Sequence, residues 1–565
     1  MKKTRKIVIV LLLLFTFILL ASQNIIASNA GLFQKEEYSE EFKEWLQLPE
    51  EERKNVIMPR MYEVKTQQVI SKNPLYMARR LKASLNSKYS LKNTIPTNTV
   101  IKNQQQTNSC WAFATLSSLE TNLALSNYKK GINLSKVYDF SERHMEYATS
   151  KTFANNVENE HGYNRQVGSG GSYLFSTSYL TNGSGAIPES EMPFQNNENI
   201  IDISQIQNKT ISSQVYDTVI FPDYKNQTDE QKTEIMNQIK QHIQNYGSVQ
   251  ASIHGDSSST TISCYNNDTG AKYCNSSVLH SINHAVSIIG WDDNYSIDNF
   301  LEDAKPTTKG AWIVKNSWGE KAGEWKLSTL KENIFAKYTQ ECISKGWGSA
   351  DKIPNEFIQQ SGYIIDGDNA YIKYGDNGII YISYEDANVS NQMFGIIKAT
   401  DTVDYDYIYQ YDEFFPARQL SLNSSKMMLG NIFNKKTNGT EYLTQVSLYA
   451  PQTYTCKVYV NPNGMSMEKD AMELVTLKAG ESETFNAGYH TLEFSKPIEL
   501  KGDSFAVVIE IQSNTSTTEF SLENKIENLE AWDSVTVEDG KCFLAAGNDL
   551  DNCQWLDLSK LTEQY

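Results

Sequence analysis

The residues of this chain best suited to carry chemistry begin with a cysteine at the predicted start of a helix. Cys110 stands in the segment Ile101–Phe113, IKNQQQTNSCWAF, where apolar residues begin to recur at helical spacing. A thiol at a helix N-terminus faces the positive end of the helix dipole and free N–H groups, which lower its pKa and favour the nucleophilic thiolate. Gln104, six residues earlier, can place its side-chain amide beside the Cys110 N–H, giving two donors for the oxyanion of a tetrahedral intermediate. A lone helical cysteine is more often structural, and the spacing from Gln104 together with Ser-Cys-Trp favours the nucleophile.

A thiolate nucleophile requires an imidazole that stabilises it and protonates the leaving group, and the imidazole requires an orienting partner. His284 opens a short apolar run and is the predicted acid and base, whereas three other histidines lack such a setting: His144, His254 and His280. Asn316, in the segment Trp312–Gly319, can accept the imidazole N–H, and Trp318 can shield that bond from water. Any one of these residues could be structural, but three motifs in this order indicate a catalytic set.

The elements that must position these residues are one long helix and several short strands. Ser109–Tyr128 is predicted to be an amphipathic helix with Asn108 and Ser109 as capping candidates, and Ala285–Trp291 and Ala311–Lys315 are predicted strands. A helix-rich first half and a strand-rich second half indicate the α+β fold class. After about Ala387 the pattern changes to alternating runs separated by turns, which predicts an all-β sandwich. Its strands are expected at Gln445–Tyr449, Thr455–Val460, His490–Phe494 and Phe505–Ile511.

Length and charge limit the class of protein. A chain of 565 residues is expected to form two or three domains, and 40% hydrophobic residues suffice for packed cores. Its 51 Lys and Arg against 68 Asp and Glu give a formal charge of −17, which argues against a nucleic-acid partner.

The N-terminus has the pattern of an export signal followed by a prosegment. A basic start and the apolar run Ile7–Leu20 predict a secretory signal peptide over residues 1–30, because the run is shorter than the ~20 residues that a membrane span needs. The protein is therefore expected to be secreted or held at the cell surface. Residues 31–88 are charged, helix-permissive and slightly basic against an acidic body, which indicates a helical prosegment that acts as the chain's own inhibitor.

Seven cysteines leave at least one thiol unpaired. Cys264 with Cys274 and Cys542 with Cys553 could each close a short disulfide loop, or all seven could be thiols. There is no CxxC pair, so no metal is expected at the site and no cofactor is required. Calcium in the β domain, bound by carboxylates, is a weakly supported possibility.

The three motifs together resemble the papain family of cysteine peptidases, whose pattern is Gln, Ser-Cys-Trp-Ala-Phe, His-Ala-Val and Lys-Asn-Ser-Trp-Gly. The resemblance implies a two-lobed catalytic domain, with a helical lobe and a β-barrel-like lobe, and a polypeptide substrate. It implies Cys110 as nucleophile, His284 as acid and base, Asn316 as orienting residue and Gln104 as oxyanion donor. The segment Phe140–Glu142 also matches, and Gly168–Gly171 resembles the glycine segment whose backbone pairs with substrate. Gly170, Gly171 and Trp318 are thus the predicted substrate-binding residues.

The chain also departs from the family pattern. Thr107 replaces a frequent cysteine, and His284 and Asn316 lie 174 and 206 residues after Cys110, beyond the ~130–150 of the family signature. The closing strand is best matched by Gly375–Ile379, which makes residues of about 320–372 an insertion in a catalytic domain spanning 89–387.

The order of domains resembles surface cysteine proteases of Gram-positive anaerobes that carry a lectin-like domain. Tyr409–Asp412 and Gly488–Thr491 match motifs of that domain, which is expected at 388–565. The resemblance implies an extracellular endopeptidase with cell-wall or surface-layer components as further partners. Two alternatives stay open: a Cys-His amidase or transpeptidase of cell-wall peptide, and an adhesin with a relic catalytic domain.

Overall fold

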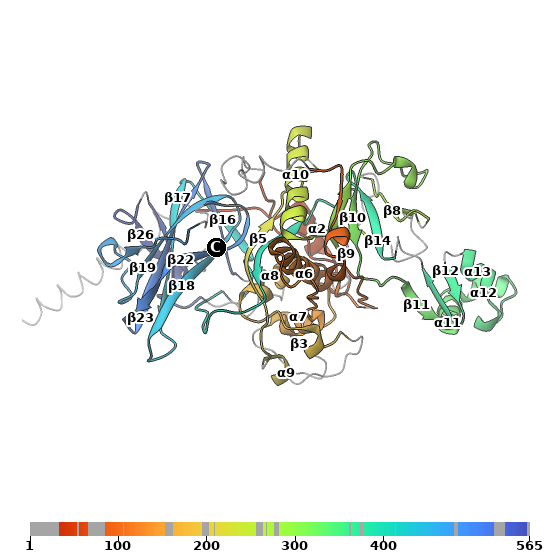
Figure 1. The fold of residues 1–565 in the computed structure, drawn as a ribbon, viewed down its shortest axis with the longest axis horizontal. Helices are drawn as coiled ribbons and strands as arrows, with labels where there is room; N and C mark the ends of the chain where they lie inside the picture. Colours follow the sequence, from red (N-terminus) through yellow and green to blue (C-terminus); the bar gives the residue numbers. More distant parts are fainter. Residues whose placement is uncertain are drawn as a thin grey trace, which may run out of the picture.

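The structure is a computed structural model in which the fold divides into a central catalytic region, a small inserted subdomain and a C-terminal β region (Figure 1). It describes residues 33–561 except 54–55, 66–84, 106, 153–161, 195–202, 208, 226, 256–263, 267, 276–281, 361–362, 373–374, 376, 413, 480–483, 525–536 and 548. The predicted signal peptide therefore lies outside the described residues, as does part of the predicted prosegment. No helix in the described part of the chain is long and apolar enough to span a bilayer.

The central region packs a buried helix against an antiparallel sheet, which confirms the α+β class. Helix α6 (Cys110–Lys130) contributes sixteen buried residues and ends at Gly131, whose φ of 68° closes the last turn. It packs against β9 (His284–Asp292) and β15 (Phe394–Thr400). The sheet runs in the order β5-β15-β6-β9-β10-β14. Its other strands are β5 (Gln214–Ile220), β6 (Val249–Ile253), β10 (Ala311–Lys315) and β14 (Ile379–Ser383).

The boundary expected between the two domains at residue 387 is placed too early. β15 pairs with β5 from Phe394↔Ile220 to Thr400↔Gln214 and with β6 on its other side. It is therefore an internal strand of the catalytic sheet, and this sheet continues to Thr400. The change in sequence pattern after Ala387 marks a turn-rich segment that leads into β15 rather than the end of the domain.

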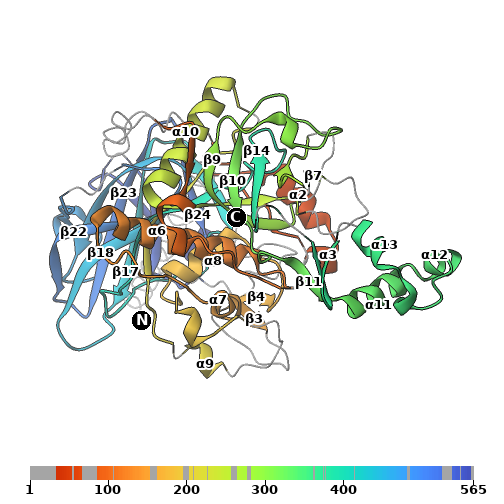
Figure 2. The ribbon, with the colours of Figure 1, turned by 45° about the vertical axis from the view of Figure 1, so that its right-hand side comes forward.

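The insertion expected at about 320–372 is a small subdomain with a core of its own. It comprises β11 (Ala322–Lys326), α11 (Leu327–Lys337), α12 (Thr339–Ser344), α13 (Asn355–Gln360), β12 (Tyr363–Asp366) and β13 (Asn369–Ile372). Leu330, Cys342, Ile353 and Ile358 are buried within it. Figures 1 and 2 both show it projecting from the body. Its own sheet, β11-β13-β12, is separate from the catalytic sheet in the part of the chain that the structure describes.

The C-terminal region is a β sandwich, and all four of the predicted strands are present. They lie within β18 (Glu441–Ala450), β19 (Tyr454–Asn461), β22 (Gly488–Leu500) and β23 (Ser504–Ser513). One layer is the seven-stranded sheet containing β19, β23 and β17 (Lys426–Asn434), with β25 (Cys542–Ala546) and β26 (Gln554–Asp557) at its edge. The other layer contains β18 and β22, and apolar side chains of both layers share one core.

The sandwich is joined to the catalytic domain through a continuous sheet. β22 pairs with β5 at His490↔Asp217, and the Ile220 N–H donates to the Ala487 carbonyl at 2.9 Å. Gly488 makes this approach possible, since its φ is +149° and a Cβ there would collide with the Thr218 carbonyl. The two domains are therefore held by backbone pairing as well as by side chains.

The described N-terminal residues contact both domains. Two helices, α2 (Glu40–Gln47) and α3 (Glu50–Arg53), lie where a helical prosegment is predicted, and Phe42 and Trp45 of α2 are buried. Strand β1 (Phe33–Lys35) is not predicted from the sequence, and it pairs with β16 (Arg418–Leu422) of the C-terminal region. The buried Arg60 donates to the Phe221 carbonyl of the catalytic domain at 2.9 Å.

Of the two disulfides left open by the sequence, one is formed. Cys264 and Cys274 are bonded, with their Cα atoms 5.1 Å apart. Cys542 and Cys553 are separate thiols, as are Cys110, Cys342 and Cys456.

Candidate active site

Cys110 is the first residue of α6, and the first turn of this helix has no side-chain cap. Both capping candidates are used elsewhere: the Ser109 hydroxyl donates to Thr107 Oγ1 at 2.7 Å, and the Asn108 amide donates to the Gly168 carbonyl at 3.2 Å. The N–H groups of Cys110 and Trp111 point at the Cys110 sulfur instead and favour its thiolate. The N–H groups at the start of α6 therefore stabilise the Cys110 thiolate instead of bonding to a capping side chain.

The Cys110 thiol is buried, and burial dominates its protonation. Cys110 is only 4% exposed. Burial raises the pKa of Cys110 to about 11, although three backbone N–H groups act to lower it. One of these donors is the N–H of Ala285, the residue after His284. The start of β9 therefore lies against the start of α6, which brings the predicted histidine next to the predicted nucleophile.

His284 is oriented by Asn316 and covered by Trp318. Its Nε2 donates to Asn316 Oδ1 at 2.6 Å, which leaves Nδ1 as the other ring nitrogen. The rings of His284 and Trp318 lie 4.5 Å apart and 30° from parallel. Burial lowers the pKa of His284 to about 4, whereas the bond to Asn316 acts in the opposite direction.

The positions of His284 and Asn316 follow from neighbouring strands. His284 begins β9 and Asn316 follows the end of β10, and these strands are antiparallel partners with Lys315 opposite Ser287. The end of one strand therefore meets the start of the other. Asn316 is held further by its own N–H, which donates to the Gly378 carbonyl at 3.0 Å.

Gln104 is attached to the asparagine motif as well as to the cysteine loop. Its N–H donates to the Ser317 carbonyl at 2.7 Å, and its Oε1 accepts from the Ser317 hydroxyl at 2.6 Å. Its Nε2 donates to the Thr107 carbonyl at 2.7 Å, in the turn that leads to Cys110. Since an amide nitrogen carries two hydrogens, one donor remains for an oxyanion.

The glycine segment lies against the tryptophan that follows Cys110. A Cβ at Gly171 would overlap the Trp111 ring, so only glycine allows the backbone to pass so closely. Gly168 turns the segment with a φ of +81° and is held by Asn108. The backbone of Gly170 and Gly171 is thereby positioned beside the cysteine loop.

Arg165 holds the glycine segment in place, a role that the sequence motifs do not indicate. Its guanidinium donates to the Ser169 carbonyl at 2.5 Å and more weakly to the Gly170 carbonyl at 3.4 Å. It also lies over the Trp111 ring at 5.1 Å, and Glu146 supplies the opposing charge. No local pattern around Arg165 indicates this role, because its partners come from α6, the glycine segment and α7 (Glu142–Ala148).

Lys102 was also missed, and it anchors the loop that carries Gln104. Its ammonium pairs with Glu120 at 2.7 Å, Asp139 at 2.7 Å and Glu142 at 2.9 Å. These carboxylates outweigh burial and raise the pKa of Lys102 well above its usual value. The sequence could not indicate this role, because Lys102 has no acidic neighbour in the chain and its three partners lie 18 to 40 residues later.

Two of the other histidines are buried in structural settings, and two lie outside the described residues. His144 bonds to the Tyr179 hydroxyl at 2.6 Å, and burial lowers the pKa of His242 to about 3. His161 and His280 lie outside the described residues. Among the described residues, no group of three or more His, Cys, Asp or Glu side chains could hold a metal ion. A buried thiol, an oriented imidazole and a free amide donor together suit acyl transfer through a covalent thioester.

Comparison with known proteins identifies both regions. Residues 87–342 match the papain family cysteine protease model, and residues 408–565 match the lectin like domain model. A search of curated proteins gave no significant match. Among solved structures, the chain is similar to the cysteine protease and lectin-like domains of Cwp84, a surface layer associated protein of Clostridium difficile. That match has 21% identity and a TM-score of 0.63, and it covers 94% of this chain and 95% of the other. A Cwp84 variant after propeptide cleavage matches at 22% identity and a TM-score of 0.61, covering 85% and 96%.

Proposed function

We propose that this chain, which carries a papain-family cysteine protease domain followed by a lectin-like domain, is an exported endopeptidase that cleaves extracellular or surface proteins after its prosegment is removed. The observation that carries the proposal is the 2.6 Å bond between His284 Nε2 and Asn316 Oδ1, beside an Ala285 N–H directed at Cys110. This bond leaves Nδ1 of His284 to accept the proton of the Cys110 thiol, and Asn316 fixes the plane of the ring.

Catalysis then follows from these groups. The Cys110 sulfur attacks the peptide carbonyl carbon while its proton passes to His284 Nδ1, and the oxyanion takes hydrogen bonds from the Cys110 N–H and the Gln104 amide. His284 gives the proton to the leaving amine, which breaks the C–N bond and leaves a thioester. Water, deprotonated by His284, attacks that thioester and releases the carboxylic acid and the free thiol.

Substrate would bind beside the glycine segment. The Gly170 and Gly171 backbone, held by Arg165 and lying against Trp111, offers N–H and C=O groups to an extended peptide. Trp318, packed on His284, covers the leaving-group side.

The N-terminal segment is proposed to be an inhibitor that is released on maturation. Its described part is packed into the body, since Phe42 is fully buried and the Met58 carbonyl accepts from the Gln392 amide at 3.2 Å. Burial raises the pKa of Cys110 and lowers that of His284, which favours a neutral thiol and a neutral imidazole in this form.

The lectin-like domain is proposed to localise the enzyme at a cell surface, as the name of the similar Clostridium difficile protein suggests. No cofactor is needed for the thiol chemistry, and calcium in this domain remains an untested proposal. The alternatives are a cell-wall amidase or transpeptidase and an adhesin with a relic catalytic domain.

The test compares substrates and variants of the processed, secreted protein. We expect hydrolysis of casein and of fluorogenic peptides, without release of peptide from peptidoglycan. His284→Ala should abolish peptide hydrolysis, whereas Asn316→Ala should lower kcat by about a hundredfold, since it removes orientation and leaves the reacting groups. His280→Ala serves as the control. Loss of activity in His280→Ala with an active His284→Ala would refute the assignment, and peptidoglycan release alone would favour the amidase.

A further inference from the structure

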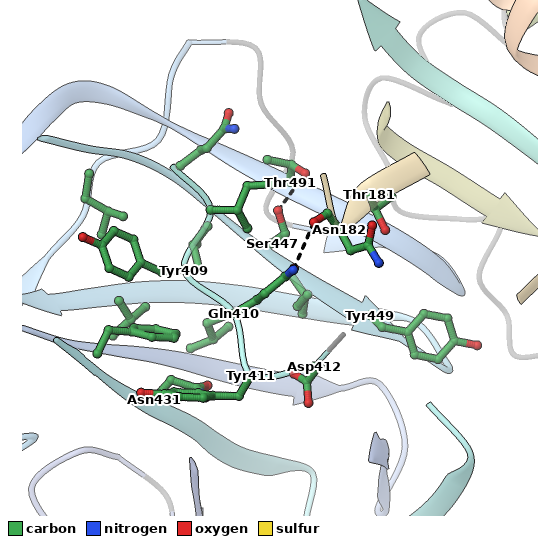
Figure 3. A pocket seen from close by; sticks show the side chains of 18 of the residues that line it. Thr181, Asn182, Tyr409, Gln410, Tyr411, Asp412, Asn431, Ser447, Tyr449 and Thr491 are labelled. Carbon is green, nitrogen blue, oxygen red and sulfur yellow. Dashed lines mark hydrogen bonds between the residues drawn. The ribbon is translucent and has the colours of Figure 1, made fainter. Parts of the chain in front are cut away.

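A cavity lies where the linker between the domains crosses the C-terminal sheet. This cavity of about 740 Å³ is enclosed by linker residues of the segment 404–416, by β18 and by the end of α8 (Tyr173–Thr181). Figure 3 shows Tyr409–Asp412 of the linker beside Ser447 and Thr491 of the sheet. None of the proposed catalytic residues lines it. Its volume is in the range of pockets that hold small ligands, roughly 300–1,000 Å³.

The lining combines aromatic rings with uncharged polar groups. Eight tyrosines line the wall, and two of them are well exposed, Tyr407 at 49% and Tyr442 at 57%. Amides and hydroxyls lie between them: the Gln410 amide donates to the Asn182 carbonyl at 3.0 Å, and the hydroxyls of Ser447 and Thr491 are 2.9 Å apart. Flat rings interleaved with such groups suit a sugar, whose faces stack and whose hydroxyls form hydrogen bonds.

The charges of the lining all have one sign. Among the described residues that line the cavity there are five carboxylates and no lysine, arginine or histidine: Asp404, Asp406, Asp412, Glu441 and Glu523. Two described cations lie behind the wall: Lys436 lies over the Tyr409 ring at 5.4 Å and donates to the Ile408 carbonyl at 2.6 Å, and Lys398 lies over the Tyr216 ring at 5.6 Å. An anionic ligand would therefore be repelled, and a cationic one attracted.

Three of these carboxylates are occupied by neighbouring groups. Asp404 accepts from the Tyr216 hydroxyl at 2.6 Å, Glu441 accepts from Tyr409 and Thr437, and Glu523 accepts from the Phe414 N–H. Asp406 and Asp412 make no hydrogen bond or ion pair with any residue that the structure describes. Asp412 lies on the solvent-exposed wall of the cavity, and desolvation by the surrounding protein raises the pKa of its carboxyl.

We propose that this cavity binds an amino sugar whose nitrogen carries a positive charge, with Asp412 as the ion-pair partner and Tyr442 as a stacking surface. The proposal deepens, and rests on, the localising role of the lectin-like domain. A lysine-rich peptide would carry the same positive charge as the amino sugar. It lacks the ring hydroxyls that would form hydrogen bonds with the amides and hydroxyls of this wall.

The test is calorimetric binding to the full secreted chain at pH 6, with four probes: a glucosamine trisaccharide, its N-acetylated form, a galacturonic acid trisaccharide and trilysine. We expect the glucosamine probe to bind more tightly than the N-acetylated form, and no binding of the uronic acid. Asp412→Asn should weaken glucosamine binding about tenfold, as the loss of one charge-assisted hydrogen bond predicts, and leave N-acetylated binding nearly unchanged. Tyr442→Ala should weaken both sugars.

Matched controls are Asp303→Asn and Tyr128→Ala, which change exposed residues away from the cavity and should alter neither affinity. Tighter binding of trilysine would reassign the site to a basic peptide. Absence of glucosamine binding, or equal binding to Asp412→Asn, would overturn the proposal. Peptidase activity is measured on the same samples, so its loss would count against the proposed function and not against this site.

Discussion

The protonation of Cys110 depends on two opposing influences on one sulfur atom. Burial raises its pKa, whereas the N–H groups of Ala285, Trp111 and Cys110 lower it, and burial dominates in this form. His284 is affected in the opposite sense, because burial removes the charged form of an imidazole. Both shifts favour the neutral forms of the two groups in the unprocessed chain.

This balance predicts the pH dependence of Cys110 alkylation in the unprocessed chain. With a pKa of about 11, raised from the ordinary 9.0, the thiolate fraction and hence the iodoacetamide rate should be low at pH 7. The rate should rise about tenfold per pH unit and level off only near pH 11. Mass spectrometry of the peptide containing Cys110 gives the rate. A rate that is already constant at pH 7 would indicate a preformed thiolate–imidazolium pair and contradict this reading.

At the scale of elements, the site depends on junctions between the ends of a helix, two strands and a glycine loop. The strands β9 and β10 could be predicted because their apolar runs are continuous, and α6 because its apolar spacing is helical. Strand β1 could not, since it has three residues and its partner β16 lies almost 400 positions later. β15 was assigned to the wrong domain for the same reason: its pairing with β5 and β6 is long-range.

The role of Arg165 gives a test of the glycine loop. Arg165→Lys keeps the charge but loses the planar fork that reaches Ser169 and Gly170, so the loop should lose order. We expect KM for a peptide substrate to rise about tenfold with kcat changed less than threefold, because one or two charge-assisted hydrogen bonds are lost. Arg143→Lys, outside the loop, is the control. A fall in kcat at unchanged KM would show that Arg165 acts on the catalytic groups instead.

Helix α2 gives a test of prosegment docking. Phe42 is fully buried and stacks on Trp45 at 5.6 Å, so Phe42→Ala should cost about 3–5 kcal/mol in the docking of this segment. The unprocessed protein should then show a lower Tm and faster release of its N-terminal segment, measured by calorimetry and N-terminal sequencing. Lys43→Ala, on the exposed side of the same helix, should change neither. Equal processing rates for both variants would contradict a docking role for α2.

At the scale of the whole molecule, the two domains and the N-terminal segment form one connected body. The sheet passes from the catalytic domain into the sandwich at β5 and β22, and the N-terminal segment pairs with β16 while Lys65 pairs with Glu519. The sequence motifs predicted the fold class of each domain but not the contacts that connect the domains, because each of these contacts joins short segments that are far apart in the chain.

This arrangement predicts where the chain can be shortened. A chain ending at Ala387 lacks β15, an internal strand between β5 and β6, and should not fold. A chain ending at Asp406 keeps β15 and the bond from Tyr216 to Asp404, and it should fold and cleave small peptides at near-normal rates. Circular dichroism and a fluorogenic peptide assay distinguish the two. A folded, active chain ending at Ala387 would show that β15 is dispensable, and an unfolded chain ending at Asp406 would show that the sandwich is structural.

The central claim is that Cys110 forms the acyl-enzyme, and mass spectrometry of the trapped acyl group tests it directly. The processed protein is mixed with an activated N-acyl amino acid ester, quenched in acid within the first turnovers, digested and mapped. The account predicts one acyl group per chain on the peptide containing Cys110, none in Cys110→Ala, and an unchanged burst in Cys553→Ala, which removes the partly exposed thiol of the sandwich. An acyl group on another cysteine, or steady hydrolysis in Cys110→Ala, would contradict it.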